Sequence, residues 1–233
     1  MRINKYLASC GLASRRKVEE LIKDGRIKVN GKVETNFGYD VQENDVVLFD
    51  EKPVTLPNKF EYYMLNKPVG YISSAMDDRG RKTVTSLIKT SARIFPVGRL
   101  DFNSEGLLLL TNDGELMNKL THPKNNIGKT YLVEVNDYVD NETLNKLRDG
   151  VVIDNYKLHK CLIDVLYAKP NHTKMKITLF EGRNREIRKM FEVFNKTVVF
   201  LKRISIQKLQ LGNLKKGEYR NLTTEEVEYL KSL

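Results

Sequence analysis

The feature of this chain that most constrains its fold is a glycine-bounded loop that leads into an apolar strand. Between Gly98 and Gly106, the segment Arg99-Leu100-Asp101 places a large apolar residue between two opposite charges. A glycine on each side indicates a backbone path that few other residues can follow. The run Leu107–Leu110 predicts a strand directly behind this loop, which we call the Asp101 loop. Rigidly held loops often carry chemistry, so Asp101 is a candidate functional side chain; an ordinary loop with a surface ion pair is the alternative.

The charge balance narrows the class of partner. Among 233 residues, 40 Lys and Arg stand against 30 Asp and Glu, a net charge of +10. Such an excess favours a polyanionic partner, and nucleic acid before a membrane surface. The sequence has no apolar run of transmembrane length and no signal-peptide pattern at its start. Cys10 and Cys161 lack the spacing of a disulfide framework, so we expect reduced thiols and a cytoplasmic protein.

Residues 1–52 are expected to form a small domain of helices and strands. Helical spacing of apolar residues begins at Ile3, and Ser14 is a favourable N-cap for a second helix. The pair Asn30-Gly31 lies between alternating apolar residues and predicts a β-hairpin. Residues 53–59 contain two prolines and no periodicity, which is typical of a semi-rigid linker.

Basic residues gather in the first 33 positions, where nine Lys and Arg stand against three Asp and Glu. The cluster Arg15-Arg16-Lys17 lies at the start of the second expected helix, where the helix dipole disfavours cations. A solvated charged face is one interpretation; contact with RNA or DNA phosphates is the one we favour. The candidate contacts in this part are Arg2, Lys5, Arg15, Arg16, Lys17 and Arg26.

Residues 60–233 alternate between short strands and helices. Their order is too irregular for repeating parallel βαβ units, so we predict an α+β domain on a mostly antiparallel sheet. Strands are expected at 61–65, 94–97, 107–111, 130–135, 151–153, 162–166, 175–180 and 198–201, and helices at 84–88, 115–120, 142–147, 185–194 and 225–230.

Two further segments carry candidate site residues. Gly128–Val135 alternates as a strand and carries Tyr131, which is either a half-buried strand aromatic or a ring that stacks on a base. In the expected helix at 185–194 one face is apolar, while Arg185 and Arg188 share another face near the helix start. Cations gain nothing from the dipole there, so a buried carboxylate or phosphates are their expected partners.

Several common sites have no signature in this sequence. The three histidines are scattered, which argues against a metal site. There is no phosphate-binding glycine loop and no dinucleotide fingerprint. We therefore expect a site without metal or cofactor.

The Gly-Arg-Leu-Asp loop, the Lys-Thr-Tyr strand and the Glu-Gly-Arg-Asn-Arg-Glu-Ile-Arg helix together resemble the bacterial ribosomal pseudouridine synthases of the RsuA/RluB type. The motifs occur in the order of that family and with similar spacing. The first domain resembles the S4-type RNA-binding domain that commonly precedes them. The resemblance covers essentially the whole chain, including Gly217-Glu218-Tyr219-Arg220.

The resemblance implies a fold, a reaction and roles for individual residues. It implies an S4-like domain followed by a pseudouridine synthase domain, and isomerisation of uridine in ribosomal RNA without a cofactor. Asp101 would be the nucleophile, Tyr131 the ring against the target base, and Arg188 the cation paired with Asp101. It also implies a monomer acting on a loop or bulge of ribosomal RNA. Further RNA contacts are expected from Arg99, Lys129, Arg183 and Arg185.

Alternatives remain for the substrate and for the class. The triplet Asn184-Arg185-Glu186 is similar to the branch acting on large-subunit ribosomal RNA, whereas the small-subunit branch more often carries Tyr-His-Gln there. A non-catalytic ribosome-assembly factor is a second class, although simple RNA binding gives no reason to keep a carboxylate among cations. A DNA-binding regulator would need a recognition helix, and none is evident.

Overall fold

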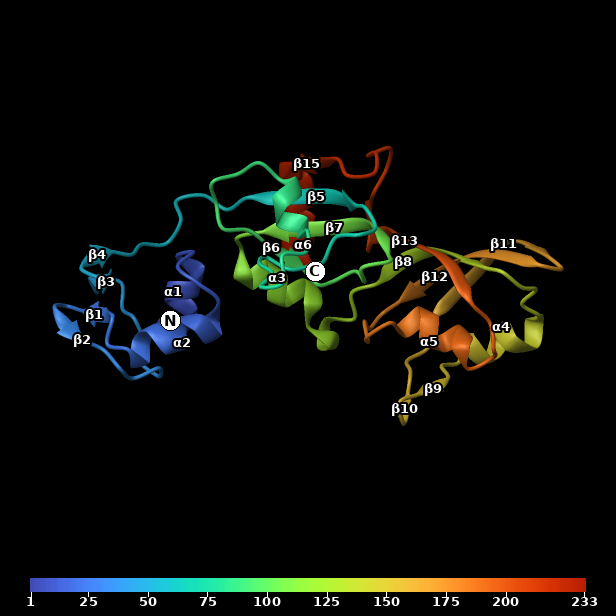
Figure 1. Ribbon diagram of the computed structural model, residues 1–233, viewed down its shortest axis with the longest axis horizontal. Coiled ribbons are helices and arrows are strands. Elements are labelled where there is room, and N and C mark those ends of the chain that lie inside the picture. The colour runs from blue at the N-terminus through green and yellow to red at the C-terminus, as the bar shows by residue number, and fades with distance from the viewer. The chain divides into compact units, whose positions relative to one another are not determined.

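The structure of the protein is a computed structural model that describes residues 1–233 (Figure 1). The chain forms two compact units. The first unit is Met1–Glu61 with Thr90–Arg93 and Asn112–Gly114, and the second unit is the remainder of the chain. No helix combines the length and the apolar character needed to cross a membrane.

The first unit contains two helices and a small antiparallel sheet. The helices are α1 (Ile3–Ser9) and α2 (Arg15–Lys23). The sheet has the order β2-β1-β3-β4, with β1 at Ile27–Val29, β2 at Lys32–Val33, β3 at Val47–Phe49 and β4 at Lys52–Pro53. Both helices pack their apolar faces on the sheet, in a core that includes Ile3, Leu7, Val18, Ile22, Ile27 and Val47.

Local sequence accounts for the turns of this unit. The Ser14 side chain accepts a hydrogen bond from the backbone N–H of Lys17, which confirms the predicted N-cap of α2. Asn30 and Gly31 both have positive φ, as a two-residue hairpin turn between β1 and β2 requires. The strand β4 ends at Pro53, the first residue of the segment 53–59 that the sequence predicted as a linker.

The second unit is built on one mixed sheet. Its main path has the order β11-β12-β8-β13-β7-β5-β15, with β14 paired to β13 and β6 to β7. All pairs are antiparallel except β13 with β7. The bounds are β5 Tyr62–Lys67, β6 Phe95–Val97, β7 Glu105–Thr111, β8 Lys129–Val135, β11 Leu162–Lys169, β12 His172–Leu179, β13 Val198–Ile206, β14 Leu209–Gln210 and β15 Tyr219–Asn221. The predicted α+β class with a mostly antiparallel sheet is confirmed.

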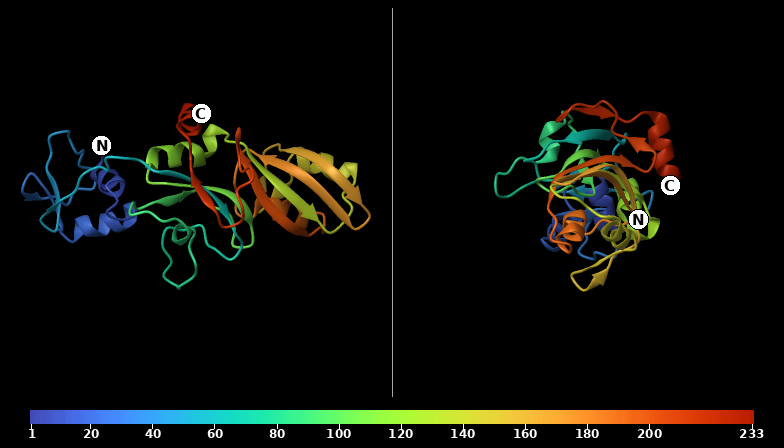
Figure 2. Two further views of the ribbon diagram at one scale, coloured as in Figure 1. Left: turned by 90° about the horizontal axis from the view of Figure 1, so that it is seen from above. Right: turned by 90° about the vertical axis from the view of Figure 1, so that its right-hand side faces the viewer.

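Helices cover both ends of this sheet. Helix α3 (Gly114–Thr121) and helix α6 (Thr224–Ser232) lie together over the core that contains Leu116, Leu120 and Leu230 (Figure 2). Helices α4 (Asn141–Arg148) and α5 (Glu186–Glu192) lie below the strands β8, β11 and β12 in Figure 1. Two short 3₁₀ helices, η1 (Val84–Leu87) and η2 (Pro123–Asn125), and the hairpin of β9 (Val152–Ile153) and β10 (Tyr156–Lys157) complete the unit.

The structure differs from the sequence prediction at two elements of the site. The helix predicted at 185–194 is shorter, because Arg185 has a left-handed backbone (φ 52°) and Phe194 lies beyond the last turn. Strand β13 continues five residues further than predicted, to Ile206. Lys202 and Arg203 interrupt its apolar pattern, yet both are paired with neighbouring strands.

Candidate active site

The Asp101 loop connects β6 to β7 and is fixed by hydrogen bonds on both sides of Asp101. Ser73 Oγ donates to Leu100 O at 2.8 Å and accepts from Leu100 N at 3.0 Å. Ser104 N donates to Asp101 O at 3.0 Å. Leu100 is buried, whereas Asp101 is only half-buried. The large apolar side chain therefore anchors the loop and leaves the carboxylate accessible.

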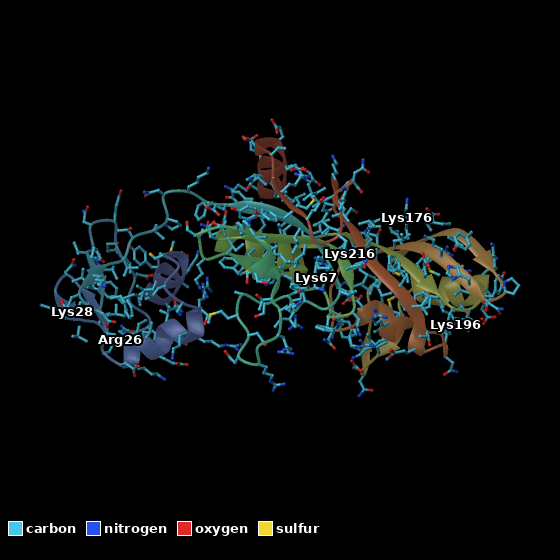
Figure 3. All side chains as sticks on the ribbon, turned by 45° about the horizontal axis from the view of Figure 1, so that its top comes forward. Arg26, Lys28, Lys67, Lys176, Lys196 and Lys216 are labelled. Atoms are coloured by element: carbon cyan, nitrogen blue, oxygen red, sulfur yellow. The ribbon has the colours of Figure 1, made fainter.

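A buried lysine closes this loop from behind. Lys67, the last residue of β5, is fully buried in the second unit (Figure 3). Its Nζ donates to the carbonyl oxygens of Asp101 (3.0 Å), Ser104 (2.8 Å) and Pro68 (3.1 Å). Burial lowers the pKa of Lys67 to about 8, and the charges of Asp101 and Glu105 oppose this shift. Lys67 thus sets the backbone that carries Asp101.

The strand after the loop passes unusually close to β13. Gly106 has φ +109°, and a Cβ there would lie 2.2 Å from Arg203 O and 2.7 Å from Arg203 N. Only glycine permits this approach. The second glycine of the predicted motif is therefore required by the parallel pairing of β7 with β13 rather than by the loop itself.

Tyr131 enters the site from β8. It lies opposite Ile177 of β12 and Arg203 of β13, and only 8% of its surface is exposed. The Arg203 Cζ atom lies 6.0 Å from the centre of the Tyr131 ring. Tyr131 is both a buried strand aromatic and a wall of the cavity that contains Asp101.

Arg188, on α5, holds the far end of the Asp101 loop. Its Nη1 donates to Val198 O at 2.9 Å and its Nη2 to Asn103 O at 3.2 Å. No salt bridge within 4 Å joins it to Asp101. Burial lowers the pKa of Arg188, as does the charge of Arg185, while Asp101 acts in the opposite direction. The two charges are thus coupled electrostatically without direct contact.

These side chains surround a cavity of about 180 Å³. This is smaller than the clefts that take drug-sized ligands. Its walls include Asp101, Tyr131, Lys129, Glu186 and Arg203, together with apolar residues such as Leu120, Ile127, Leu179, Leu201 and Ile206. Arg188 is outside this lining set.

Two further ionisable groups of the cavity have shifted pKa values. Burial raises the pKa of Glu186 to about 7, opposed chiefly by the hydrogen bond from Arg183 N at 2.7 Å. Burial also lowers the pKa of Lys129 to about 8, and Arg203 acts in the same direction. Lys129 Nζ donates to Ile127 O at 3.0 Å. Lys129 therefore belongs to the cavity wall rather than to the outer surface.

Comparison with known proteins agrees with this geometry. The model of the RNA pseudouridylate synthase family matches residues 61–193, and that of the S4 domain matches residues 1–47. The chain belongs to the RNA pseudouridylate synthase family. It is an enzyme of this family with an N-terminal S4 domain, as the sequence motifs predicted.

Known relatives align with this synthase along its whole length. The chain is 44% identical to the ribosomal large subunit pseudouridine synthase B of Bacillus subtilis (strain 168), and the alignment covers 100% of this chain and 96% of the relative. An uncharacterized RNA pseudouridine synthase of Aquifex aeolicus (strain VF5) is 42% identical over 99% of this chain and 93% of its own length. A crystal structure of a pseudouridylate synthase aligns over 99% of both chains with a TM-score of 0.72 and 28% identity.

The predicted outer cations of the synthase's second unit lie around the cavity. Arg99 is exposed and lines it. Arg183 lies 3.2 Å from the centre of the Tyr156 ring, and its Nε donates to Glu181 at 3.3 Å. Arg185 forms an ion pair with Glu192 at 3.7 Å. All three lie at the surface of the synthase near the Asp101 loop or α5.

The predicted cations of the first unit differ in their ion pairs and in their exposure. Lys17 pairs with Glu20 at 2.6 Å, and Arg26 forms a bidentate pair with Asp50. Arg2, Arg15 and Arg16 are exposed, and Lys5 is half-buried.

Sequence reasoning missed Lys67 and Arg203. A signal for Lys67 existed, because this lysine follows the apolar run Tyr62–Leu65 after a single residue, Asn66, with no acidic neighbour in sequence. Arg203 had no comparable signal. In the described chain, no three His, Cys, Asp or Glu side chains are grouped so that they could hold a metal ion.

Proposed function

We propose that this synthase converts a uridine of ribosomal RNA to pseudouridine, with Asp101 as the nucleophile. The observation that carries the proposal is an accessible carboxylate at the wall of a cavity that Tyr131 also lines, on a loop fixed by Lys67 and Arg188. A carboxylate so held can attack with little loss of orientation.

The reaction rearranges bonds within one nucleotide. The C1′–N1 bond breaks, the base turns, and a C1′–C5 bond forms. The proton on C5 is released and N1 gains one, so atoms and electrons balance without a second substrate. In the proposed sequence the Asp101 carboxylate bonds to C1′ and is later displaced by C5. Tyr131 packs against the base during the turn, and the positive charge of Arg188 attracts the Asp101 carboxylate without a direct ion pair.

The large subunit is the proposed source of the RNA. The support is the similarity to the ribosomal large subunit pseudouridine synthase B of Bacillus subtilis together with the Asn184-Arg185-Glu186 triplet. A small-subunit target is the alternative. A base must leave its stack to enter the cavity, and this costs less in a loop or bulge than in a duplex.

We also propose the domain bounds, the oligomeric state, the compartment and the RNA contacts of this synthase. We propose an S4 domain over residues 1–52, a linker over residues 53–59 and a catalytic domain over residues 60–233, acting as a monomer. The free thiols Cys10 and Cys161 fit a reducing cytoplasm. The proposed backbone contacts are Arg99, Lys129, Arg183 and Arg185 around the cavity, and Arg2, Lys5, Arg15, Arg16, Lys17 and Arg26 in the S4 domain.

Pseudouridine mapping of total ribosomal RNA tests the proposal. Cells lacking the gene are compared with cells rescued by the wild type or by Asp101→Asn, which removes the nucleophile and keeps its shape. We expect one large-subunit site to disappear and to return only with the wild type. Activity of a clean Asp101→Asn preparation would contradict the assignment of the nucleophile.

Two other outcomes would change the proposal. Loss of a small-subunit site would correct the substrate and leave the chemistry in place. A defect in ribosome assembly without any changed site would favour a non-catalytic assembly factor.

A further inference from the structure

Arg203 is the one guanidinium in the wall of the cavity that is almost completely buried. It is 2% exposed, and it comes from the middle of β13. Its Nε donates to Leu107 O at 2.7 Å. Its Nη2 is buried and has no hydrogen-bond partner in the protein. A buried cationic donor without a partner is costly, so its retention calls for an explanation.

The surrounding charges do not supply a partner. The groups electrostatically coupled to Arg203 include Lys67 and Lys129, both cations. Glu105, on the strand that pairs with β13 at this point, forms its ion pair with Lys216 at 2.6 Å. Asp101 and Glu186 also line the cavity, but neither forms a salt bridge with Arg203, so an acceptor from outside the protein would be favoured.

The position of Arg203 is fixed by the fold. Its backbone lies against Gly106, where no Cβ can be accommodated, and its Nε is tied to the next residue of β7. Its Cζ atom lies 6.0 Å from the ring of Tyr131. A base packed against Tyr131 would thus lie near a guanidinium whose position the fold already sets.

We propose that Arg203 donates a hydrogen bond from Nη2 to a carbonyl oxygen of the target uracil. This inference rests on the proposed function. When the C1′–N1 bond breaks, its electron pair stays with the base, and the negative charge spreads over N1 and the two carbonyl oxygens. Asp101 bonds to C1′ in the same step. Arg203 transfers no proton; it stabilises the anion of the departing base while the base turns.

A uracil carbonyl fits this donor better than a backbone phosphate. Arg203 lies deep in the cavity, whereas Arg99, Arg183 and Arg185 are exposed at the outer part of its lining. Phosphates remain in solvent and meet the outer cations. The base is the part of a flipped nucleotide that enters a deep, partly apolar cavity.

Arg203→Lys is the sharpest variant, because it keeps the charge and a donor for Leu107 O but removes Nη2. The substrate is a short transcript spanning the mapped site, assayed under single-turnover conditions. We expect the rate to fall about 100-fold, as when one preorganised donor is lost, with RNA affinity changed less than threefold. Lys202→Met, on the neighbouring position of β13 and outside the cavity lining, is the matched control and should retain the wild-type rate.

Sulfur substitution in the RNA separates recognition of the base from a structural role. The target uridine is replaced by 2-thiouridine or by 4-thiouridine, because sulfur is a poor hydrogen-bond acceptor. One replacement should slow the wild type about tenfold or more and slow Arg203→Lys no further. Arg203→Met repeats the test without the charge, and thermal unfolding checks that each variant is folded.

The outcomes distinguish this inference from the proposed function. If the wild type converts uridine but both sulfur replacements slow it and Arg203→Lys by the same factor, Arg203 has a structural role only and the inference is wrong. If the wild type forms no pseudouridine in any ribosomal transcript, the proposed function itself fails.

Discussion

The charged side chain of Lys67 holds the backbone of the Asp101 loop in place. Three carbonyl oxygens accept hydrogen bonds from one buried ammonium, and two of them belong to residues of the Asp101 loop. The bond to Ser104 is buried and the bonds to Asp101 and Pro68 are partly buried, so water replaces the ammonium poorly and Lys67 acts as a positioning residue for Asp101.

Lys67→Met should leave these carbonyls unsatisfied. We expect the free energy of unfolding to fall by about 3 kcal/mol and the rate of uridine conversion to fall at least about tenfold. Urea unfolding and single-turnover assays measure the two effects. Lys176→Met, on the exposed face of β12, is the matched control and should change stability by less than about 0.5 kcal/mol (Figure 3). Equal stability of the two variants would contradict the role assigned to Lys67.

Glu186 should make stability depend on pH. Its pKa in the folded protein is about 7, above the ordinary value of 4.5, so the folded state holds a proton that the unfolded chain releases. This stabilisation is present below pH 4.5 and lost as the pH rises through about 7. At 1.36 kcal/mol per pKa unit, the loss is at most about 3 kcal/mol.

Glu186→Gln keeps an acceptor for Arg183 N and removes the titration. We expect the variant to be more stable than the wild type at pH 8, with the difference disappearing toward pH 5. Chemical unfolding at several pH values measures it. Parallel pH profiles for both proteins would show that Glu186 is not the titrating group.

At the scale of elements, the parallel contact between β7 and β13 decides where the site forms. It brings Arg203 beside the strand that follows the Asp101 loop, and it requires the absence of a side chain at Gly106. The shorter α5 acts similarly: the left-handed turn at Arg185 starts the helix one residue late, and Arg188 then reaches the carbonyl of Asn103.

Gly106→Ala should separate these strands. Its Cβ would meet the backbone of Arg203 at 2.2 Å, and φ +109° is unfavourable for alanine. We expect a loss of at least about 3 kcal/mol in the free energy of unfolding and no measurable activity. Gly114→Ala, at the start of α3 with nothing within 4 Å of the added Cβ, is the control and should be neutral or slightly stabilising. A stable, active Gly106→Ala protein would disprove the steric argument.

At the scale of the whole molecule, the excess of positive charge should govern RNA affinity. Ion pairs already neutralise part of the charge of the first unit, at Lys17 with Glu20 and at Lys28 with Glu51. Arg15 and Arg16 are exposed on the first turn of α2. We therefore expect the unpaired Arg15 and Arg16 to contribute more to RNA affinity than the paired Lys17 and Lys28 do.

The double change Arg15→Gln and Arg16→Gln should weaken binding of a ribosomal transcript about tenfold. It should also lower the slope of log affinity against log salt by one to two, roughly one counterion for each lost phosphate contact. Lys17→Gln with Lys28→Gln removes the same charge from paired positions and should have a smaller effect. Filter binding at several salt concentrations measures both; equal slopes would show that α2 does not contact phosphates.

The sequence by itself determined most of the local structure and the family. Caps, the Asn30-Gly31 turn and the apolar strand at Leu107–Leu110 are decided by neighbouring residues, and short motifs in a fixed order indicate the reaction. The pairing of β13 with β7, the burial of Lys67 and the donor at Arg203 were decided only by the tertiary structure. Arg203 and Leu107 are 96 positions apart, and no local pattern records a contact over that separation. The buried cations became recognisable when the fold brought Lys67 to the Asp101 loop and Arg203 to the same cavity, because burial makes such charges costly and strengthens their interactions.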